Sequence, residues 1–140
     1  MISRLYNING VLVRKYTTKY SIKWDKPSRS KIQFRTKQFL KRYWIACQVF
    51  EEFPVFGTKM RVDILNLSKN IAVEVNGPQH KEYNKFFHNG SLENFHKSLR
   101  RDALKYRWLK RNNIELIEIE EKDIDQLSPE YIYDNFEIKI

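Results

Sequence analysis

Four acidic side chains and one imidazole are spaced so that successive structural elements would carry them. They are Glu52, Asp63, Glu74, His80 and Asp102. Carboxylates gathered at one site repel each other unless a positive charge neutralises them, and hard divalent cations take oxygen ligands. A metal bound there can contact a phosphate oxygen, activate a water and stabilise the charge that develops in phosphodiester cleavage. The set therefore predicts a site for Mg²⁺ or Mn²⁺.

Two predicted strands position the central pair of carboxylates. Residues 60–65 and 71–76 alternate aliphatic and polar side chains, and Ser68-Lys69-Asn70 supplies a turn between them. The aliphatic rows would be Met60, Val62 and Ile64 in the first strand, and Ile71, Val73 and Val75 in the second. Asp63 and Glu74 would then lie on the opposite side of an antiparallel hairpin from these rows.

The remaining acids fall on two flanking elements. Residues 49–55 form a predicted strand with Glu51 and Glu52 in its middle. Adjacent strand residues face opposite ways, so we assign Glu52 to the site and Glu51 to solvent, although the pattern alone allows the reverse. Residues 77–90 form a long loop with His80, and a helix capped by Ser91 follows to about residue 111. The apolar stripe of this helix comprises Leu92, Phe95, Leu99, Ala103, Tyr106 and Leu109.

Asp102 falls within that apolar stripe, where a carboxylate is costly unless it meets a cation, a metal or several donors. Residues 114–119 form a further predicted strand, and Ser128-Pro129-Glu130 is typical of a helix start. The fold class is therefore α/β (α+β), with a central mixed sheet flanked by helices.

The first third of the chain is strongly basic. Residues 3–24 predict short strands around an Asn9-Gly10 turn, and residues 31–47 predict an amphipathic helix. The polar face of that helix carries Lys31, Arg35, Lys37, Lys41 and Arg42, which either follow a phosphate backbone or are simply solvated. Lys81, Arg100 and Arg101 are further candidates for phosphate contacts, with the same alternative.

Composition sets the broad class. The chain has 140 residues, 41% of them hydrophobic, and a formal net charge of +9. This suits one globular domain with a polyanionic partner, and nucleic acid leads that list. Cys47 is the single cysteine, and the sequence contains neither a leader pattern nor an apolar run long enough for a membrane span. We therefore expect a cytoplasmic protein without a membrane partner; a bacterial or phage-infected cell is what the family resemblance given below implies.

We divide the chain into three parts. Residues 1–30 form a basic β-rich extension, residues 31–121 form the core, and residues 122–140 form an acidic segment with a short helix packed on the core. Only two basic residues lie beyond residue 111, Lys122 and Lys139, so charge is strongly polarised along the sequence. A basic face for phosphates and an acidic end that stays away from them would follow from this distribution.

The chain resembles the PD-(D/E)XK nucleases. Asp63 is followed, after a short hairpin, by Glu74-Val75-Asn76, where that superfamily has Glu-x-Lys. More narrowly, it is similar to the very-short-patch-repair-like branch, which includes phage and homing endonucleases with an E-D-x-H-D signature. The matching stretches are residues 51–65, 72–80 and 86–88, Arg101-Asp102, Trp108 and Asn113. The resemblance covers about residues 30–120 and depends on the set rather than on any one piece.

The resemblance implies a restriction-endonuclease-like core whose active site contains Glu52, Asp63, His80 and Asp102, with Glu74 beside them. Asp63 would be the central metal ligand, assisted by Glu52, Glu74 and Asp102. His80 would polarise the attacking water or protonate the leaving oxygen. Asn76 departs from the superfamily's Lys and cannot act as a cation, so that duty would pass to His80, to Lys81 or to a second metal.

The expected function is a Mg²⁺-dependent DNA endonuclease of phage or mobile-element type. One alternative is a binding module that keeps this scaffold without cleavage, which Asn76 favours, and another is a subunit of a larger nucleic-acid-processing assembly. Charge does not distinguish DNA from RNA, since Lys and Arg meet similar backbones. A monomer that nicks one strand and a homodimer that cuts both are open alternatives.

Overall fold

The computed structural model describes residues 1–77 and 92–140, and side chains 92–95 are outside this description. The predictions made for His80, Lys81 and the Ser91 cap also fall outside it. The elements in chain order are β1 (Ile2–Tyr6), β2 (Leu12–Tyr16), η1 (Thr18–Tyr20), α1 (Lys31–Trp44), β3 (Val49–Pro54), β4 (Arg61–Asn66), β5 (Ile71–Asn76), α2 (Leu92–Arg111), β6 (Glu115–Glu120), η2 (Glu121–Gln126) and α3 (Pro129–Phe136).

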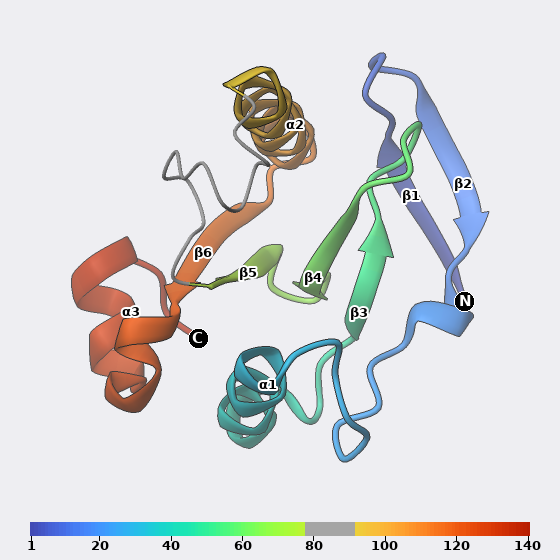
Figure 1. Ribbon diagram of the computed structural model, residues 1–140. Coiled ribbons are helices and arrows are strands. Elements are labelled where there is room, and N and C mark those ends of the chain that lie inside the picture. Colours follow the sequence, from blue (N-terminus) through green and yellow to red (C-terminus); the bar gives the residue numbers. More distant parts are fainter. Residues whose placement is uncertain (78–91) are drawn as a thin grey trace.

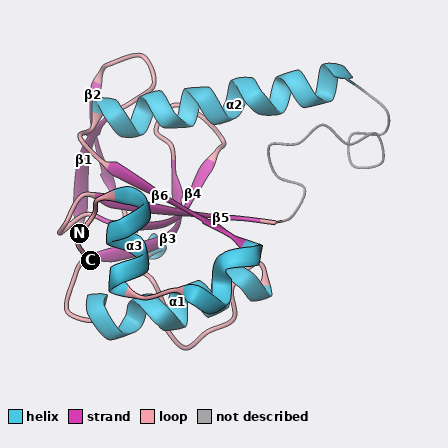
Figure 2. Cartoon of the chain, turned by 90° about the vertical axis from the view of Figure 1, so that its left-hand side faces the viewer, coloured by secondary structure: helices cyan, strands magenta, loops and turns pink. Residues whose placement is uncertain are grey.

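A four-stranded sheet of order β3-β4-β5-β6 forms the centre of the molecule. Its pairs are antiparallel except β5 with β6, which is parallel because α2 makes the crossover between them. Helix α2 lies over one side, and α1 and α3 lie over the other (Figures 1 and 2). Trp108 and Leu109 of α2 pack in one hydrophobic cluster, while Leu40 and Trp44 of α1 pack in the second. The predicted mixed sheet flanked by helices is confirmed.

Local signals in the sequence predicted several elements correctly. The β1–β2 hairpin turns at Gly10, whose φ of +81° favours glycine. Ser30 accepts a hydrogen bond from the Gln33 N–H at the start of α1, and Ser128 caps α3 in the same way. Within the described ranges, none of the helices combines the length and hydropathy that a bilayer span requires.

The predicted single aliphatic row of β4 is wrong. Val62 packs in the cluster beneath α2, whereas Ile64 packs in the cluster beneath α1 and α3. The break coincides with Glu52 on the partner strand, which has a φ of +53° between the pairs Glu51↔Ile64 and Phe53↔Val62. A residue in the left-handed region interrupts the strict alternation of side chains along a strand. By the register, Glu52 lies opposite Asp63, and at this point the side chains of β4 change from one face of the sheet to the other.

The predicted buried stripe of α2 is correct only near its C-terminal end. Trp108 and Leu109 are buried, but Leu99, Ala103 and Tyr106 are exposed. Figure 2 shows the reason, because the first part of α2 extends beyond the edge of the sheet that its last turns cover. Asp102 is half-buried, so its surroundings are more open than a position inside an apolar stripe would be.

Lys37 does not lie on the outer basic face of α1, as predicted, but is 0% exposed. Its Nζ donates to the backbone carbonyls of Lys23 and Lys26, at 3.0 and 2.6 Å, and to Glu51 Oε1 at 3.0 Å. Glu51, predicted to be solvated, is instead the half-buried partner of this lysine. Three oxygens satisfy the ammonium group, which makes burial of the charge tolerable and ties the segment before α1 to β3.

Replacing this lysine should destabilise the protein. We expect Lys37→Met to lower the free energy of unfolding by about 3 kcal/mol, because it leaves the Glu51 carboxylate half-buried without its cation. Urea unfolding followed by tryptophan fluorescence measures the change. Arg42→Ala, at an exposed position on the same helix, is the matched control and should change the value by less than about 0.5 kcal/mol. Equal values for both variants would contradict the structural role of Lys37.

Candidate active site

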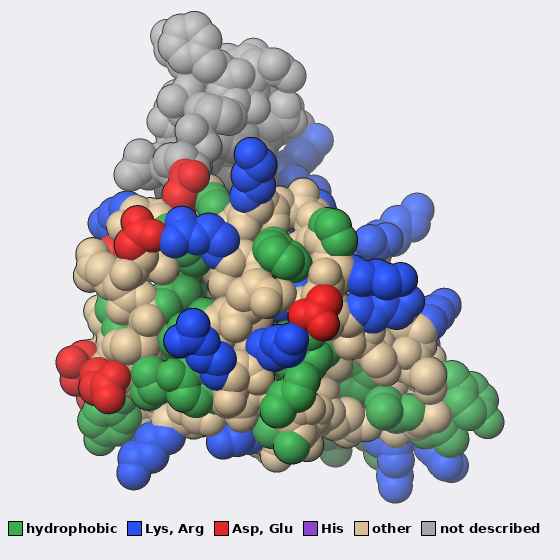
Figure 3. Space-filling model, turned by 90° about the horizontal axis from the view of Figure 1, so that it is seen from below, with side chains coloured by type: hydrophobic (Ala, Val, Ile, Leu, Met, Phe, Trp, Pro, Cys, Tyr) green, Lys and Arg blue, Asp and Glu red, His purple; other side chains and the backbone are tan. Residues whose placement is uncertain are grey.

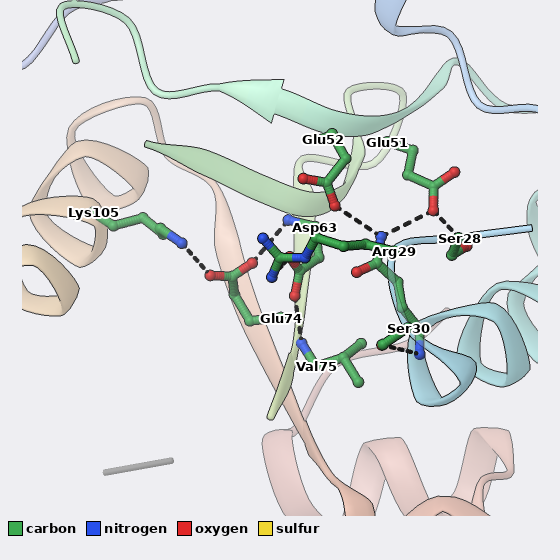
Figure 4. Close-up of polar contacts among 10 residues, drawn as sticks. Ser28, Arg29, Ser30, Glu51, Glu52, Asp63, Glu74, Val75 and Lys105 are labelled. Atoms are coloured by element: carbon green, nitrogen blue, oxygen red, sulfur yellow. Dashed lines mark hydrogen bonds and ion pairs between the residues drawn. The ribbon is translucent and has the colours of Figure 1, made fainter. Parts of the chain in front are cut away.

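The hydrogen-bond ladder between β4 and β5 opens at Asp63 and Glu74. The paired residues run from Asn66↔Ile71 to Ile64↔Val73. Beyond them, the Asp63 N–H donates to Glu74 Oε2 at 2.8 Å, and the Val75 N–H donates to Asp63 Oδ2 at 2.8 Å. Each carboxylate thus replaces a backbone carbonyl as acceptor on the other strand (Figure 4). These reciprocal bonds fix two acids side by side and leave one oxygen of each for other partners.

Glu52 joins this pair from β3. Gln33 of α1 donates from Nε2 to Glu52 Oε1 at 3.0 Å and to Glu51 Oε2 at 2.9 Å, so one amide orients both acids. Ser28 also donates to Glu51 Oε2, at 2.6 Å. Glu51 is therefore occupied by structural donors, whereas the Glu52 charge acts on Asp63. This arrangement supports the choice of Glu52 over Glu51 as the site residue.

The Asp63 carboxyl group is electrostatically perturbed. Burial in the first place, and then the charge of Glu74, raise its pKa to about 7, with a smaller contribution from Glu52. The hydrogen bond from the Val75 N–H and the charge of Lys105 act in the opposite direction. Burial and the Glu74 charge both disfavour the ionised carboxyl group, so an added positive charge would stabilise it.

Two cations that the sequence analysis did not assign to the site lie beside the acids. Lys105 of α2 forms a short ion pair with Glu74 Oε1, and an Arg29 nitrogen lies 3.9 Å from Asp63 Oδ1 (Figure 4). Lys105 follows Asp102 by three residues, so the two lie on one face of the helix. This spacing is the feature of the sequence that could have predicted Lys105 at the site. Arg29 had no such signal, because it is brought in by the loop that Lys37 anchors.

A groove of about 250 Å³ adjoins the acids. Its lining includes Glu74, Asn76, Asp102, Lys105 and Glu118. The structure therefore brings Asp102 and Glu74, two residues predicted for one site, to one groove. Asn76 Nδ2 lies 3.3 Å from Glu118 and from Glu120 on β6. Asn76 thus points to acids, while Lys105 of α2 supplies a cation.

The donors suit a hard divalent cation. Among the side chains of residues 1–77 and 96–140, no group of three or more His, Cys, Asp or Glu residues is arranged so that it could hold a metal ion. Asp63 Oδ1 nevertheless accepts no backbone amide, Glu74 Oε1 pairs with Lys105, and the Glu52 charge acts on Asp63. Carboxylate oxygens are the ligands that Mg²⁺ and Mn²⁺ prefer, and an ion would relieve the repulsion that raises the Asp63 pKa.

The basic residues predicted to contact nucleic acid are distributed over two helices. On α1, Arg35 forms a short ion pair with Asp125, Lys41 pairs with Asp25 at 2.7 Å, and Arg42 is exposed. Arg100 and Arg101 are exposed on α2. Figure 3 shows Lys and Arg side chains spread over the face of the molecule that carries α1, with fewer acidic groups among them. Among the described members of the predicted set, Lys37 alone is buried and therefore cannot contact nucleic acid.

Comparison with known proteins adds one similarity. Uncharacterized protein 033L of Invertebrate iridescent virus 3 is 35% identical over 66 residues, which are 47% of this chain and 34% of the viral protein. The chain therefore matches about a third of the length of that relative, whose name states no activity. No family model matches the sequence, and no solved structure matches it.

The raised pKa of Asp63 makes stability depend on pH. Its unfolded value is 3.8 and its folded value is about 7, so the folded state holds the proton more tightly and loses stability as pH rises between these values. In metal-free buffer, we expect Asp63→Asn to be more stable than the wild type by about 1–3 kcal/mol above pH 7 and to show no advantage near pH 4. The Asn carbonyl can still accept the Val75 N–H.

Thermal unfolding across this pH range tests the expectation, with Asp134→Asn on the surface of α3 as control. Parallel pH profiles for wild type and Asp63→Asn would show that Asp63 is not the perturbed group.

Proposed function

We propose that this protein is a metal-dependent endonuclease that hydrolyses phosphodiester bonds in DNA, on a restriction-endonuclease-like core. The observation that carries the proposal is the cluster of Glu52, Asp63 and Glu74 at the open end of the β4–β5 ladder. Structural stability alone does not explain it, because burial and the neighbouring Glu74 charge both disfavour the ionised form of Asp63. An acidic site on a chain of net charge +9 suits a cation that in turn meets phosphate.

Asp63 and Glu52 would hold Mg²⁺ or Mn²⁺, with Glu74 beside them and Asp102 across the adjoining groove orienting water. When bound, the ion supplies Lewis-acid activation of a phosphate oxygen and lowers the pKa of a coordinated water. Glu74 fixes the strand geometry through the Asp63 N–H and holds Lys105 at the mouth of the groove. His80, outside the described residues, remains the predicted proton-transfer group.

Lys105 is the proposed substitute for the cation that Asn76 does not provide. Its ammonium group is positioned by Glu74 rather than carried on β5, and it is partly exposed in the groove. A cation there can stabilise the negative charge that builds up on the phosphate in the transition state. This assignment replaces the expectation that His80, Lys81 or a second metal alone would take over that duty.

Cleavage of supercoiled plasmid tests the proposed activity directly. We expect nicking in the presence of Mg²⁺ or Mn²⁺ that EDTA abolishes, and we expect Asp63→Ala to lower the rate by at least about 10³-fold because it removes the central ligand. Asp134→Ala, an exposed acid on α3, should cut like the wild type. DNA binding by the wild type without any cutting would favour the inactive binding module, and neither binding nor cutting would favour the assembly subunit.

A second variant separates the role of Lys105 from that of the general basic surface. Lys105→Met keeps the length of the side chain but removes the charge, and we expect cleavage to fall about 10²-fold with DNA affinity changed less than about threefold. Lys110→Met, an exposed lysine on the last turn of α2, is the matched control and should retain activity. Equal effects of the two variants on cleavage would exclude the proposed role of Lys105.

A further inference from the structure

The β1–β2 hairpin has one face against the protein and one face in solvent. In β1, Ser3 and Leu5 are buried while the residues between and beside them are exposed. The register places each outward residue opposite another on β2, and the resulting cross-strand pairs are Ile2↔Tyr16, Arg4↔Arg14 and Tyr6↔Leu12. All six side chains of these pairs are exposed. We call this surface the outer hairpin face.

Two arginines lie directly opposite each other at its centre. Like charges at opposite positions of an antiparallel pair destabilise it by a few tenths of a kcal/mol or more. Neither Arg4 nor Arg14 forms an ion pair with an acid in the described ranges, and Asp25 is the only acid among residues 1–50. Folding alone therefore gives no reason for the pair, whereas an anion bound between the arginines would remove the repulsion.

Exposed apolar side chains flank the arginines on both sides. Tyr16 is 77% exposed, and Ile2, Tyr6 and Leu12 are also exposed. Tyrosine and arginine together are the residue types that predominate at binding surfaces, because a ring offers a large flat contact and a guanidinium binds an anion. The outer hairpin face thus combines two positive charges with two aromatic rings at its opposite ends.

The hairpin is firmly held by the rest of the protein. The Trp108 Nε1–H donates to the Tyr6 carbonyl at 2.6 Å, and the Tyr6 N–H donates to Asn112 Oδ1 at 2.8 Å. Leu5 packs in the same hydrophobic cluster as Trp108 on the other side of the strand. The outer hairpin face is therefore a pre-organised surface, which lowers the entropic cost of binding a partner.

We propose that the outer hairpin face binds a single-stranded segment of nucleic acid. Arg4 and Arg14 would contact consecutive backbone phosphates, and the rings of Tyr6 and Tyr16 would stack on bases. A single strand fits better than a duplex because its bases have free faces, whereas paired bases are already stacked on their neighbours. The proposal goes beyond the nuclease activity and does not depend on it, since it concerns binding away from the acids.

Fluorescence anisotropy of a labelled oligonucleotide of about 12 nucleotides, in EDTA, tests the aromatic contribution. We expect Tyr16→Ala to weaken binding about 5- to 50-fold, because a lost stacking contact has that effect. The matched control is Tyr133→Ala on α3, where the tyrosine is 50% exposed, and it should bind like the wild type. The unlabelled duplex of the same sequence should compete less well than the single strand.

A charge reversal tests the arginine pair without loss of the fold. Arg4→Glu puts a carboxylate opposite Arg14, so we expect an equal or higher Tm together with at least tenfold weaker binding. The change removes the Arg4 contact, and the new carboxylate neutralises Arg14, so about two phosphate contacts are lost. The magnitude of the slope of log affinity against log salt should therefore decrease by about 1.4. Lys139→Glu, the same charge change at the exposed C-terminal end, should weaken binding less than about threefold.

Wild-type affinity in both Tyr16→Ala and Arg4→Glu would overturn the proposal. It would also be overturned if the wild type bound the duplex as tightly as the single strand and the two variants weakened both equally. Because the measurement contains no metal, absence of plasmid nicking would leave this result intact. If the hairpin variants nick plasmid and bind the oligonucleotide like the wild type, the nuclease proposal is supported and the outer hairpin face is excluded as a binding surface.

Discussion

Reciprocal hydrogen bonds between carboxylates and backbone amides, at the point where β4 and β5 separate, organise the candidate site. Asp63 and Glu74 each accept an N–H from the opposite strand, so two like charges are held together by the sheet itself. Glu52, with its left-handed backbone, comes opposite them from β3. Burial and the charge of Glu74 both disfavour ionisation of Asp63, so a bound cation would stabilise the carboxylate, which is the physical basis of the proposed metal site.

The rest of the structure serves to hold this acidic cluster in place and to surround it with cations. The buried Lys37 draws the chain before α1 against β3 through two backbone carbonyls and Glu51, and the same loop delivers Arg29 to Asp63. From the other side of the sheet, α2 contributes Lys105 and Asp102 to the groove. The two cations, Arg29 and Lys105, thus come from the two sides of the sheet, whereas Glu52, Asp63 and Glu74 are carried by its strands.

Charge is separated on a larger scale as well. The acids of residues 112–140 lie on β6, η2 and α3, away from the hairpin, whose outer face displays Arg4 and Arg14. The separation is incomplete, because Glu118 lines the groove and Asp125 pairs with Arg35 of α1. The viral relative covers only part of this arrangement, so the arguments for binding and cleavage rest on the side chains themselves.

Local interactions alone determine a good part of this protein. The sequence predicted both hairpins, the capped helices α1 and α3, and the acids at polar strand positions, because periodicity, turn residues and caps act over a few residues. Only the tertiary structure decided that Lys37 is buried with Glu51, that Lys105 pairs with Glu74, and that β4 changes faces at Asp63. Those outcomes depend on partners distant in sequence, whose desolvation and pairing no local pattern records.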